Sequence, residues 1–378
     1  MQTKKRILWF LLCLCLLGNG HRTQCQPPAS QTELTDEDRR EQAVRAAYDY
    51  HKVAGGQAFL VMQDGRIIFE AYDNGGGEFQ PQMLASGSKS FVGIVAIAAV
   101  QDGLLSLDER ACETLQEWTS DTLKSQITLR QLLTLSSGLT PGEIGTLGQS
   151  QPWKEILAVP MVKPPGTSFD YGPNHLCVFG EILQRKLRAR NDESFEAYLN
   201  RRILRPIGAR VVWRQSSDGN PRLGGGAWMT ARDWADFGWL ICQEGRWGQR
   251  QLLDPGLLQD CFQSSTTNPA YGLTWWLKKK VDPLLLRSIP ILMRDMGDIV
   301  NAEWLPDDLR LAAGAGKQRL YVIPSLKMVI ARLGPLTAQS PFRDADFLSL
   351  LLRGGTPEEY EARAGGLIQA RPLWPAAR

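Results

Sequence analysis

The chain has few of the residues that form metal sites. Histidine occurs three times in 378 residues, and two of the three, His51 and His175, lie beyond the N-terminal segment. Four of the seven cysteines lie well inside the chain, widely spaced and without a CxxC pair: Cys112, Cys177, Cys242 and Cys261. Zinc sites need clustered histidine or cysteine ligands. We therefore expect no metal, and a catalytic base other than histidine, although either histidine is available for a catalytic triad.

The chain also lacks a strong excess of charge of one sign. It has 43 Lys and Arg against 40 Asp and Glu, a formal net charge of +3. Four of the basic residues and none of the acidic ones lie within residues 1–25, which leaves 39 basic against 40 acidic residues in the remainder. Proteins that bind nucleic acids present a basic surface. We expect no nucleic-acid partner.

The N-terminus carries a continuous hydrophobic run directly after a group of basic residues. Basic residues at positions 4–6 precede an apolar stretch over residues 7–17, which is too short for a stable membrane span but typical of a secretory signal. We expect residues 1–25 to be a signal peptide and the protein to be periplasmic or secreted, although no small-x-small triplet marks the cleavage site. In an oxidising compartment Cys242 and Cys261 are able to pair, but separately buried thiols are the favoured interpretation.

Hydrophobic patterning predicts a sheet built from both ends of the chain and a helical middle. Asp64-Gly65 lies between two strand-like runs, a strong hairpin signal. Residues 91–100 are apolar on all sides, which predicts a fully buried helix. Further strands are predicted over 271–280 and, as two runs around Pro324-Ser325, over 319–334; terminal helices are predicted over about 35–50 and 342–352.

These elements predict an α/β (α+β) fold with an antiparallel sheet flanked by the terminal helices and a second, mostly helical lobe. The sheet domain is discontinuous and takes residues 34–93 and 268–353, and the helical domain takes residues 94–267. Residues 354–378 are rich in Gly, Pro and Arg and predict a loosely held tail.

Ser86 and Lys89 lie three positions apart at the start of the buried helix. A serine hydroxyl needs a base within hydrogen-bond reach to become a nucleophile, and a residue at i+3 lies one turn along the same helix face. Lysine has a free pKa of about 10.4, but burial and a helix N-terminus both favour its neutral amine. A chain of this length contains about one Ser-x-x-Lys by composition alone, so a simple helix cap is the alternative. The small Gly87 and the apolar helix that follows favour the catalytic interpretation.

With these residues the sequence resembles the serine β-lactamase and penicillin-binding-protein superfamily, in the branch that holds class C β-lactamases, D-aminopeptidases, carboxylesterases and 6-aminohexanoate-oligomer hydrolases. The resemblance runs from about Gly56 to about Leu333. Beyond SGSK it includes ITLRQLLTLSSGL (127–139), PPGTSFDYGPN (164–174), GGGAWMTARDWADFG (224–238) and YGLTWW (271–276). It implies a β-lactamase-like fold and catalysis without a cofactor.

The resemblance implies roles for individual residues. Ser86 would be the acylated nucleophile, Lys89 its proton acceptor, and Tyr171 the tyrosine of the second motif that passes the proton to the leaving group. The backbone N–H groups of Ser86 and Ala315 would form the oxyanion hole. The alternative for Tyr171 is a buried structural tyrosine.

The second and third motifs depart from the family pattern. In the second motif Pro173 takes the usual asparagine position and Asn174 follows it, so Asn174 is a candidate substrate contact, whereas we expect His175 to be structural. The third motif, Lys/His-Thr-Gly in the family, falls on Ala312-Ala313-Gly314, which leaves Gly314 as a candidate substrate contact but removes the cation. We expect Lys317 to be solvated.

The tryptophans suggest an apolar pocket as well as a core. Most of them are expected to be core residues, and Trp275 or Trp276 is expected near the substrate, with Trp275 chosen as the candidate contact.

The sequence therefore predicts an exported, monomeric serine hydrolase that cleaves a small-molecule ester or amide through an acyl-enzyme on Ser86. Because the third-motif cation is missing, a true β-lactamase or DD-peptidase ranks below an esterase. The alternative from another class is a non-catalytic protein that keeps the fold to bind a peptide or cell-wall fragment.

Overall fold

The computed structural model describes residues 34–143, 151–282, 284–285, 297–337, 340–356, 359 and 373–374. From Asp36 onward the chain forms one compact unit. The expected signal peptide and most of the expected tail lie outside the described residues. Within these ranges, no helix combines the length and the apolar character needed to cross a membrane.

The central element is a six-stranded sheet with strand order β2-β1-β11-β10-β9-β8, in which all neighbouring strands are antiparallel. The strands are β1 (Ala58–Gln63), β2 (Arg66–Tyr72), β8 (Trp276–Leu277), β9 (Arg310–Gly314), β10 (Gln318–Ile323) and β11 (Met328–Leu333). The β1–β2 hairpin turns at Asp64 and Gly65, both of which have positive φ, as a type I′ turn requires. The predicted sheet from both ends of the chain is confirmed.

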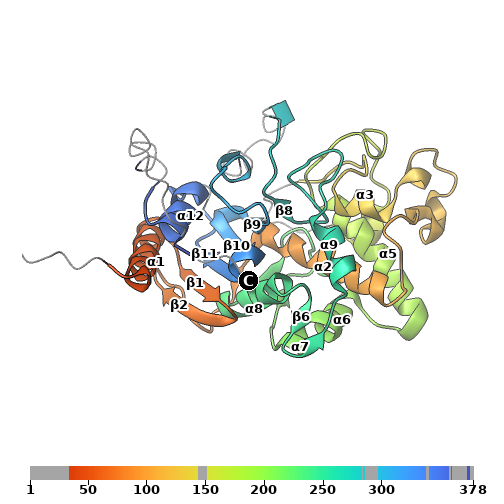
Figure 1. Ribbon diagram of the computed structural model, residues 1–378. Coiled ribbons are helices and arrows are strands. Elements are labelled where there is room, and N and C mark those ends of the chain that lie inside the picture. The colour runs from red at the N-terminus through yellow and green to blue at the C-terminus, as the bar shows by residue number, and fades with distance from the viewer. Residues whose placement is uncertain are drawn as a thin grey trace, which may run out of the picture. The chain divides into compact units, whose positions relative to one another are not determined.

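Helices pack on both faces of this sheet (Figure 1). On one face Phe59 of β1 contacts Phe347 of α12 (Asp344–Arg353) and stacks on His51 of α1 (Asp36–Val53). On the other face Leu320 of β10 and Val329 of β11 lie against Gly238 of α8 (Ala231–Cys242). Because neighbouring side chains of a strand alternate between faces, each strand contributes to two separate layers of the core.

The middle of the chain is mostly helical, as predicted. Besides α8, the described α-helices of this part are α2 (Lys89–Gln101), α3 (Leu129–Leu133), α4 (Trp153–Ile156), α5 (Asn174–Asn191), α6 (Phe195–Leu199), α7 (Arg205–Ile207) and α9 (Pro255–Gln259). Single turns of 3-10 helix include η1 (Ala85–Ser88), before α2, and η7 (Ala315–Lys317), after β9. Every residue of α2 from Lys89 to Ala99 is buried, which confirms the predicted all-round apolar helix.

The structure adds and shortens some elements. A small sheet of β3 (Gln82–Met83), β5 (Ala227–Met229) and β4 (Val212–Trp213), and the pair β6 (Arg246–Trp247) and β7 (Arg250–Gln251), have no counterpart in the prediction. The predicted strand over 271–280 is reduced to β8, because the chain turns back at positive-φ Thr274 and pairs Tyr271 with Trp276. All four described cysteines are free thiols, so the Cys242–Cys261 disulfide is not formed. The division into two domains stays a prediction.

Candidate active site

Ser86 lies in the single turn η1, between the short strand β3 and the buried helix α2. Ala85, the residue before it, has a left-handed φ of 47°, a conformation that costs free energy for a residue with a Cβ. The turn is held by Ser88, whose hydroxyl donates to the Ala85 carbonyl at 2.6 Å and accepts from the Ala227 N–H at 2.9 Å. Ser88 is fully buried, whereas Ser86 remains partly exposed. Of the two serines, Ser86 is therefore the one a substrate can reach.

The Ser86 hydroxyl does not cap α2. The N-cap residue of this helix is Ser88, and its side chain makes no cap hydrogen bond. The alternative in which Ser86-Gly87-Ser88-Lys89 is only a polar helix cap therefore has no support in the geometry.

Lys89 is buried beside Ser86, with only 4% of its surface exposed. Its Nζ lies 3.1 Å from Ser86 Oγ and donates to the Gly224 carbonyl at 2.5 Å. The same Nζ lies 4.8 Å from the centre of the Tyr171 ring. Ser86 Oγ and the Gly224 carbonyl are thus both within hydrogen-bond distance of this one amine. The geometry thus brings together the three residues that the sequence predicted.

Tyr171 lies in a loop that is held by a buried histidine. Its neighbour Asp170 donates its backbone N–H to the Leu135 carbonyl at 2.9 Å, and the Asp170 carbonyl lies 2.8 Å from His175 Nε2. The other ring nitrogen of His175 lies 2.7 Å from Ser137 Oγ. Burial lowers the pKa of His175 to about 4, so the ring is neutral near pH 7. Nε2–H therefore donates to Asp170, and Nδ1 accepts from Ser137.

The Tyr171 side chain is 8% exposed and stacks on Trp276, with 5.9 Å between ring centres. Tyr271 completes the aromatic surroundings, 4.7 Å from Trp276. Among the described residues, no partner forms a hydrogen bond with the Tyr171 hydroxyl. The hydroxyl therefore remains available to a bound molecule.

Two candidate substrate contacts have other partners in the structure. Asn174 is the first residue of α5 and donates its amide to the Thr140 carbonyl at 2.9 Å, so it holds the neighbouring loop. Trp275 is fully buried, and its indole donates to the Ser90 carbonyl at 3.1 Å. The Trp275 assignment is corrected: this side chain is a core residue, and Trp276 is the one that lies against Tyr171.

The third-motif segment, residues 312–315, approaches the turn η1 that carries Ser86 from the side of the large sheet. A Cβ on Gly314 would lie 2.0 Å from the Leu84 carbonyl and 3.1 Å from the Gly87 nitrogen, so only glycine permits this approach. Ala315, the next residue, is exposed. Ala312 and Ala313 are buried and carry no charge. The segment therefore brings main-chain groups, without a cation, to Ser86.

Lys317 does not behave as expected. It is 9% exposed rather than solvated, and its Nζ lies 3.6 Å from Asp344 of α12. The contact between Lys89 and the Gly224 carbonyl was not predicted from the sequence. The run Gly224-Gly225-Gly226 is the signal that could have indicated it, because glycines of this kind mark close approach of a backbone.

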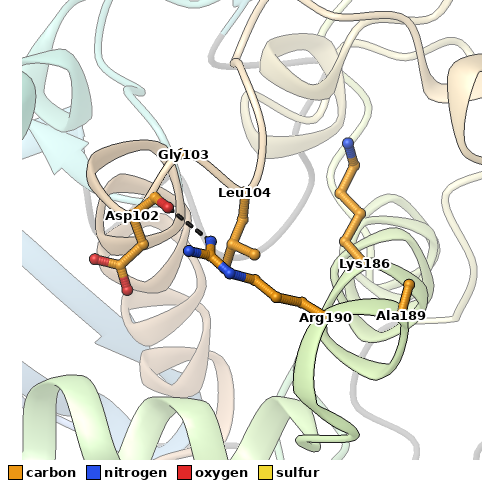
Figure 2. Close-up of a pocket in the computed structure, with 6 residues that line it drawn as sticks. All are labelled: Asp102, Gly103, Leu104, Lys186, Ala189 and Arg190. Carbon is orange, nitrogen blue, oxygen red and sulfur yellow. Dashed lines mark hydrogen bonds between the residues drawn. The ribbon is translucent and has the colours of Figure 1, made fainter.

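Figure 2 shows a surface hollow beyond the C-terminal end of α2, the end opposite to Ser86. It has a volume of about 470 Å³ and is lined by Asp102, Gly103, Leu104, Lys186, Ala189 and Arg190. Arg190 donates across it to the Asp102 carbonyl at 2.8 Å. Asp102 follows the last residue of α2, whereas Ser86 precedes the first, so the length of the helix separates the two places.

Comparison with known proteins agrees with this geometry. The sequence profile of the beta-lactamase family matches residues 39–341. A lovastatin esterase of Penicillium rubens (strain ATCC 28089 / DSM 1075 / NRRL 1951 / Wisconsin 54-1255) is 27% identical over 251 residues. That match spans 51% of this chain and 62% of the esterase, less than two thirds of its length.

Two solved structures share the fold. A protein from Bacillus anthracis described as a candidate 6-aminohexanoate-dimer hydrolase has a TM-score of 0.64 at 19% identity, covering 85% of this chain and 82% of its own. A family VIII carboxylesterase has a TM-score of 0.62 at 13% identity, covering 83% of this chain and 96% of its own. These likenesses show the β-lactamase-like fold. Since the family profile covers most of the chain, this protein belongs to the beta-lactamase family, whose related members include esterases and amide hydrolases.

Proposed function

We propose that this protein is a serine hydrolase that cleaves an ester or small amide through an acyl-enzyme on Ser86. The observation that carries the proposal is the 3.1 Å separation between the partly exposed Ser86 Oγ and the buried Lys89 Nζ. A nucleophile and its base have to meet at this distance for proton transfer to accompany attack.

In the proposed acylation, the neutral Lys89 amine accepts the Ser86 proton while Oγ forms a bond to the substrate carbonyl carbon. The negative charge that develops on the carbonyl oxygen is stabilised by the backbone N–H groups of Ser86 and Ala315. Collapse of the tetrahedral intermediate breaks the bond to the leaving group, which takes up a proton through Tyr171. Water then attacks the acyl-enzyme, and the acid is released.

Esters are the favoured substrates because no cation occupies the third-motif position on β9. Ala312 and Ala313 are uncharged, and the nearby Lys317 is paired with Asp344 instead of facing Ser86. A β-lactam carries a carboxylate that needs a cationic partner, whereas a neutral ester does not. The similarity to a lovastatin esterase supports this preference. We also propose export through a signal within residues 1–25, which sequencing the N-terminus of the mature protein would test.

The test of Lys89 as the base compares Lys89→Ala with a control substitution at a second buried lysine. Lys124 is 8% exposed, donates to the Leu157 carbonyl at 2.9 Å and lies 5.3 Å from the Trp118 ring centre, so its surroundings resemble those of Lys89 without a serine. With a p-nitrophenyl ester as substrate, we expect Lys89→Ala to lower kcat/KM by about 10³-fold, within the range for a general base. Lys124→Ala should keep native turnover.

Labelling of Ser86 decides between an enzyme and a non-catalytic binding protein. After treatment with a fluorophosphonate, mass analysis should find the adduct on the Ser86 peptide, and Ser86→Ala should abolish both adduct and turnover. A native protein that forms no adduct and hydrolyses none of a panel of p-nitrophenyl esters, nitrocefin and D-amino-acid amides would favour the binding protein. Retention of ester turnover by Ser86→Ala would refute the proposed nucleophile.

A further inference from the structure

The turn after β9 is held from behind by a buried arginine. Arg319 of β10 donates from Nη1 to the Gly314 carbonyl at 3.0 Å. Gly314 and Ala315 are joined by one peptide group, so this carbonyl belongs to the same planar unit as the Ala315 N–H. In a trans peptide the C=O and N–H bonds point in opposite directions. A donor fixed on the carbonyl therefore fixes the direction of the N–H.

Arg319 lies on the sheet face away from Ser86. It is opposite Arg332 of β11, which in turn is opposite Phe59, the residue that contacts α1 and α12. The Arg319 side chain is 3% exposed and donates twice to Asp344, from Nε at 2.6 Å and from Nη2 at 3.1 Å. Tyr321 also donates to Asp344, at 2.5 Å. These bonds fix the guanidinium firmly against the first residue of α12.

The rest of the turn is held in the same manner. Arg332 donates from Nη1 to the carbonyls of Lys317 at 2.7 Å and Gly316 at 3.3 Å. The Gln318 amide bridges to Gly334, donating to its carbonyl at 2.6 Å and accepting from its N–H at 3.0 Å. Gly316 and Lys317 both have left-handed φ, 72° and 59°, and such a conformation persists only where the surroundings enforce it. The turn is thus fixed by buried groups.

We propose that Arg319 is a positioning residue for the oxyanion hole, which aims and polarises the Ala315 N–H through the Gly314–Ala315 peptide group. A charge-assisted hydrogen bond to a peptide carbonyl strengthens the N–H of the same group as a donor. The positive charge of Arg319 thereby acts on the substrate oxygen indirectly, through the backbone, whereas Ala312 and Ala313 carry no charge. This inference rests on the proposed function, because it needs Ser86 as nucleophile and Ala315 as donor.

The test compares Arg319→Gln with Arg310→Gln. Arg310 is also a buried arginine of this sheet, 7% exposed, but it lies at the far end of β9 and donates to the Ile241 carbonyl at 3.3 Å. For a p-nitrophenyl ester we expect Arg319→Gln to lower kcat by about tenfold to a hundredfold with KM nearly unchanged, since complete loss of an oxyanion donor costs about 10²–10³-fold. Arg310→Gln should keep native kcat when both variants are assayed well below their Tm values.

A boronic acid inhibitor separates positioning from general loosening of the fold. It forms a tetrahedral adduct with Ser86 that places an oxygen in the oxyanion hole, so its Ki should rise by the same factor as kcat falls. The inference is overturned if folded Arg319→Gln keeps native kcat, if Ki does not change, or if Arg310→Gln shows the same losses. If Arg319→Gln does not fold, Arg319→Lys takes its place: parallel several-fold changes in kcat and Ki support the inference, and native values overturn it.

Different results would refute the proposed function and the role of Arg319. A native protein without ester turnover and without an adduct on Ser86 refutes the proposed function itself. A native protein with both, whose Arg319 variants keep native kcat and Ki, refutes only the role of Arg319.

Discussion

The two sides of the candidate site consist of different chemical groups. The nucleophile side, formed by Ser86, Lys89 and Tyr171, uses side chains in direct contact, with Lys89 Nζ 3.1 Å from Ser86 Oγ and 4.8 Å from the Tyr171 ring centre. The backbone side, formed by Gly314 and Ala315, offers only main-chain groups. Under the proposed function, activation of the nucleophile needs particular side chains, whereas stabilising an oxyanion needs only a peptide group held in place.

The supports of the two sides differ as well. The loop of Tyr171 is held by the neutral, buried His175, which bonds Asp170 and Ser137. The turn of Ala315 is held by ionised groups centred on Asp344. Burial alone would raise the pKa of Asp344, but Arg319 and Lys317 hold it below its usual value. The backbone side is therefore anchored by a buried ionised cluster, whereas the buried support of the nucleophile side is uncharged, and an ion pair of Asp170 with the exposed Lys163 adds to it near the surface.

The contact between the two sides is the place where a small change has the largest expected effect. In Gly314→Ala, the new Cβ would lie 2.0 Å from the Leu84 carbonyl. Because backbone cannot yield as a side chain does, β9 and η1 have to move apart. We expect kcat/KM for a p-nitrophenyl ester to fall by about 10²-fold or more, the usual result of a misplacement of about 1 Å.

Gly225→Ala is the matched control. Gly225 also lies against η1, but a Cβ added to it would have the Ala85 carbonyl carbon as its nearest neighbour, at 3.6 Å, which is an ordinary contact distance. We expect Gly225→Ala to keep activity within a few-fold of native. Equal losses in the two variants, measured by steady-state kinetics and by urea unfolding, would show that the close approach of Gly314 has no special importance.

Lowering the pH should reduce the free energy of unfolding through two buried histidines, of which His175 supports the nucleophile side. Burial lowers the pKa of His175 to about 4, and burial with the nearby Arg332 lowers that of His51 to about 3. Both histidines are neutral in the folded protein, so the unfolded chain binds more protons once the pH falls below about 6.5. Each therefore reduces the free energy of unfolding by about 1.4 kcal/mol per pH unit, from pH 6.5 down to its folded pKa.

Urea unfolding at pH 6.5 and pH 5 measures this loss. Asp236 acts in the opposite direction, because burial and Asp233 raise its pKa to about 6, so we expect a net loss of about 2 kcal/mol. In His175→Gln the amide can keep both hydrogen bonds, and the dependence on pH should become shallower. Identical slopes for the native protein and this variant would contradict the assignment of a neutral His175.

Local spacing explains what the sequence could predict about the site. Ser86 and Lys89 are one helical turn apart, and Asp64-Gly65 specifies its own hairpin, so neither depends on distant parts of the chain. The Gly224 carbonyl is 135 residues from Lys89, and Arg319 meets Asp344 only because β10 and α12 pack together. Such contacts depend on strand order and register, which composition and spacing do not contain.

The choice between Trp275 and Trp276 failed for a related reason. Adjacent residues of an extended chain point to opposite faces, so a shift of one residue exchanges core and site. The sequence pattern has two tryptophans in succession and does not determine which faces Tyr171. The buried Ser90 carbonyl that binds the Trp275 indole, and the Tyr171 ring that stacks on Trp276, decide the question only in the folded protein.

A cation placed on the backbone side would give this side a functional side chain, as the nucleophile side already has. Ala312 lies two residues before Gly314 on the same strand, so its side chain shares the face that approaches η1. In Ala312→Lys, an amine near Ser86 should attract a substrate carboxylate. We expect the ratio of kcat/KM for benzylpenicillin to that for a neutral p-nitrophenyl ester to rise by about tenfold, equivalent to about 1.4 kcal/mol.

Ala312→Met is the control, because it adds comparable length without charge. Ala312 is 2% exposed, so both variants should lose about 1–3 kcal/mol of stability through overpacking. Only the lysine should change the preference between substrates, and added salt should reduce that change, since a charge pair is screened. If methionine shifts the ratio equally, the effect is one of shape. The missing cation would then not explain the proposed preference for esters.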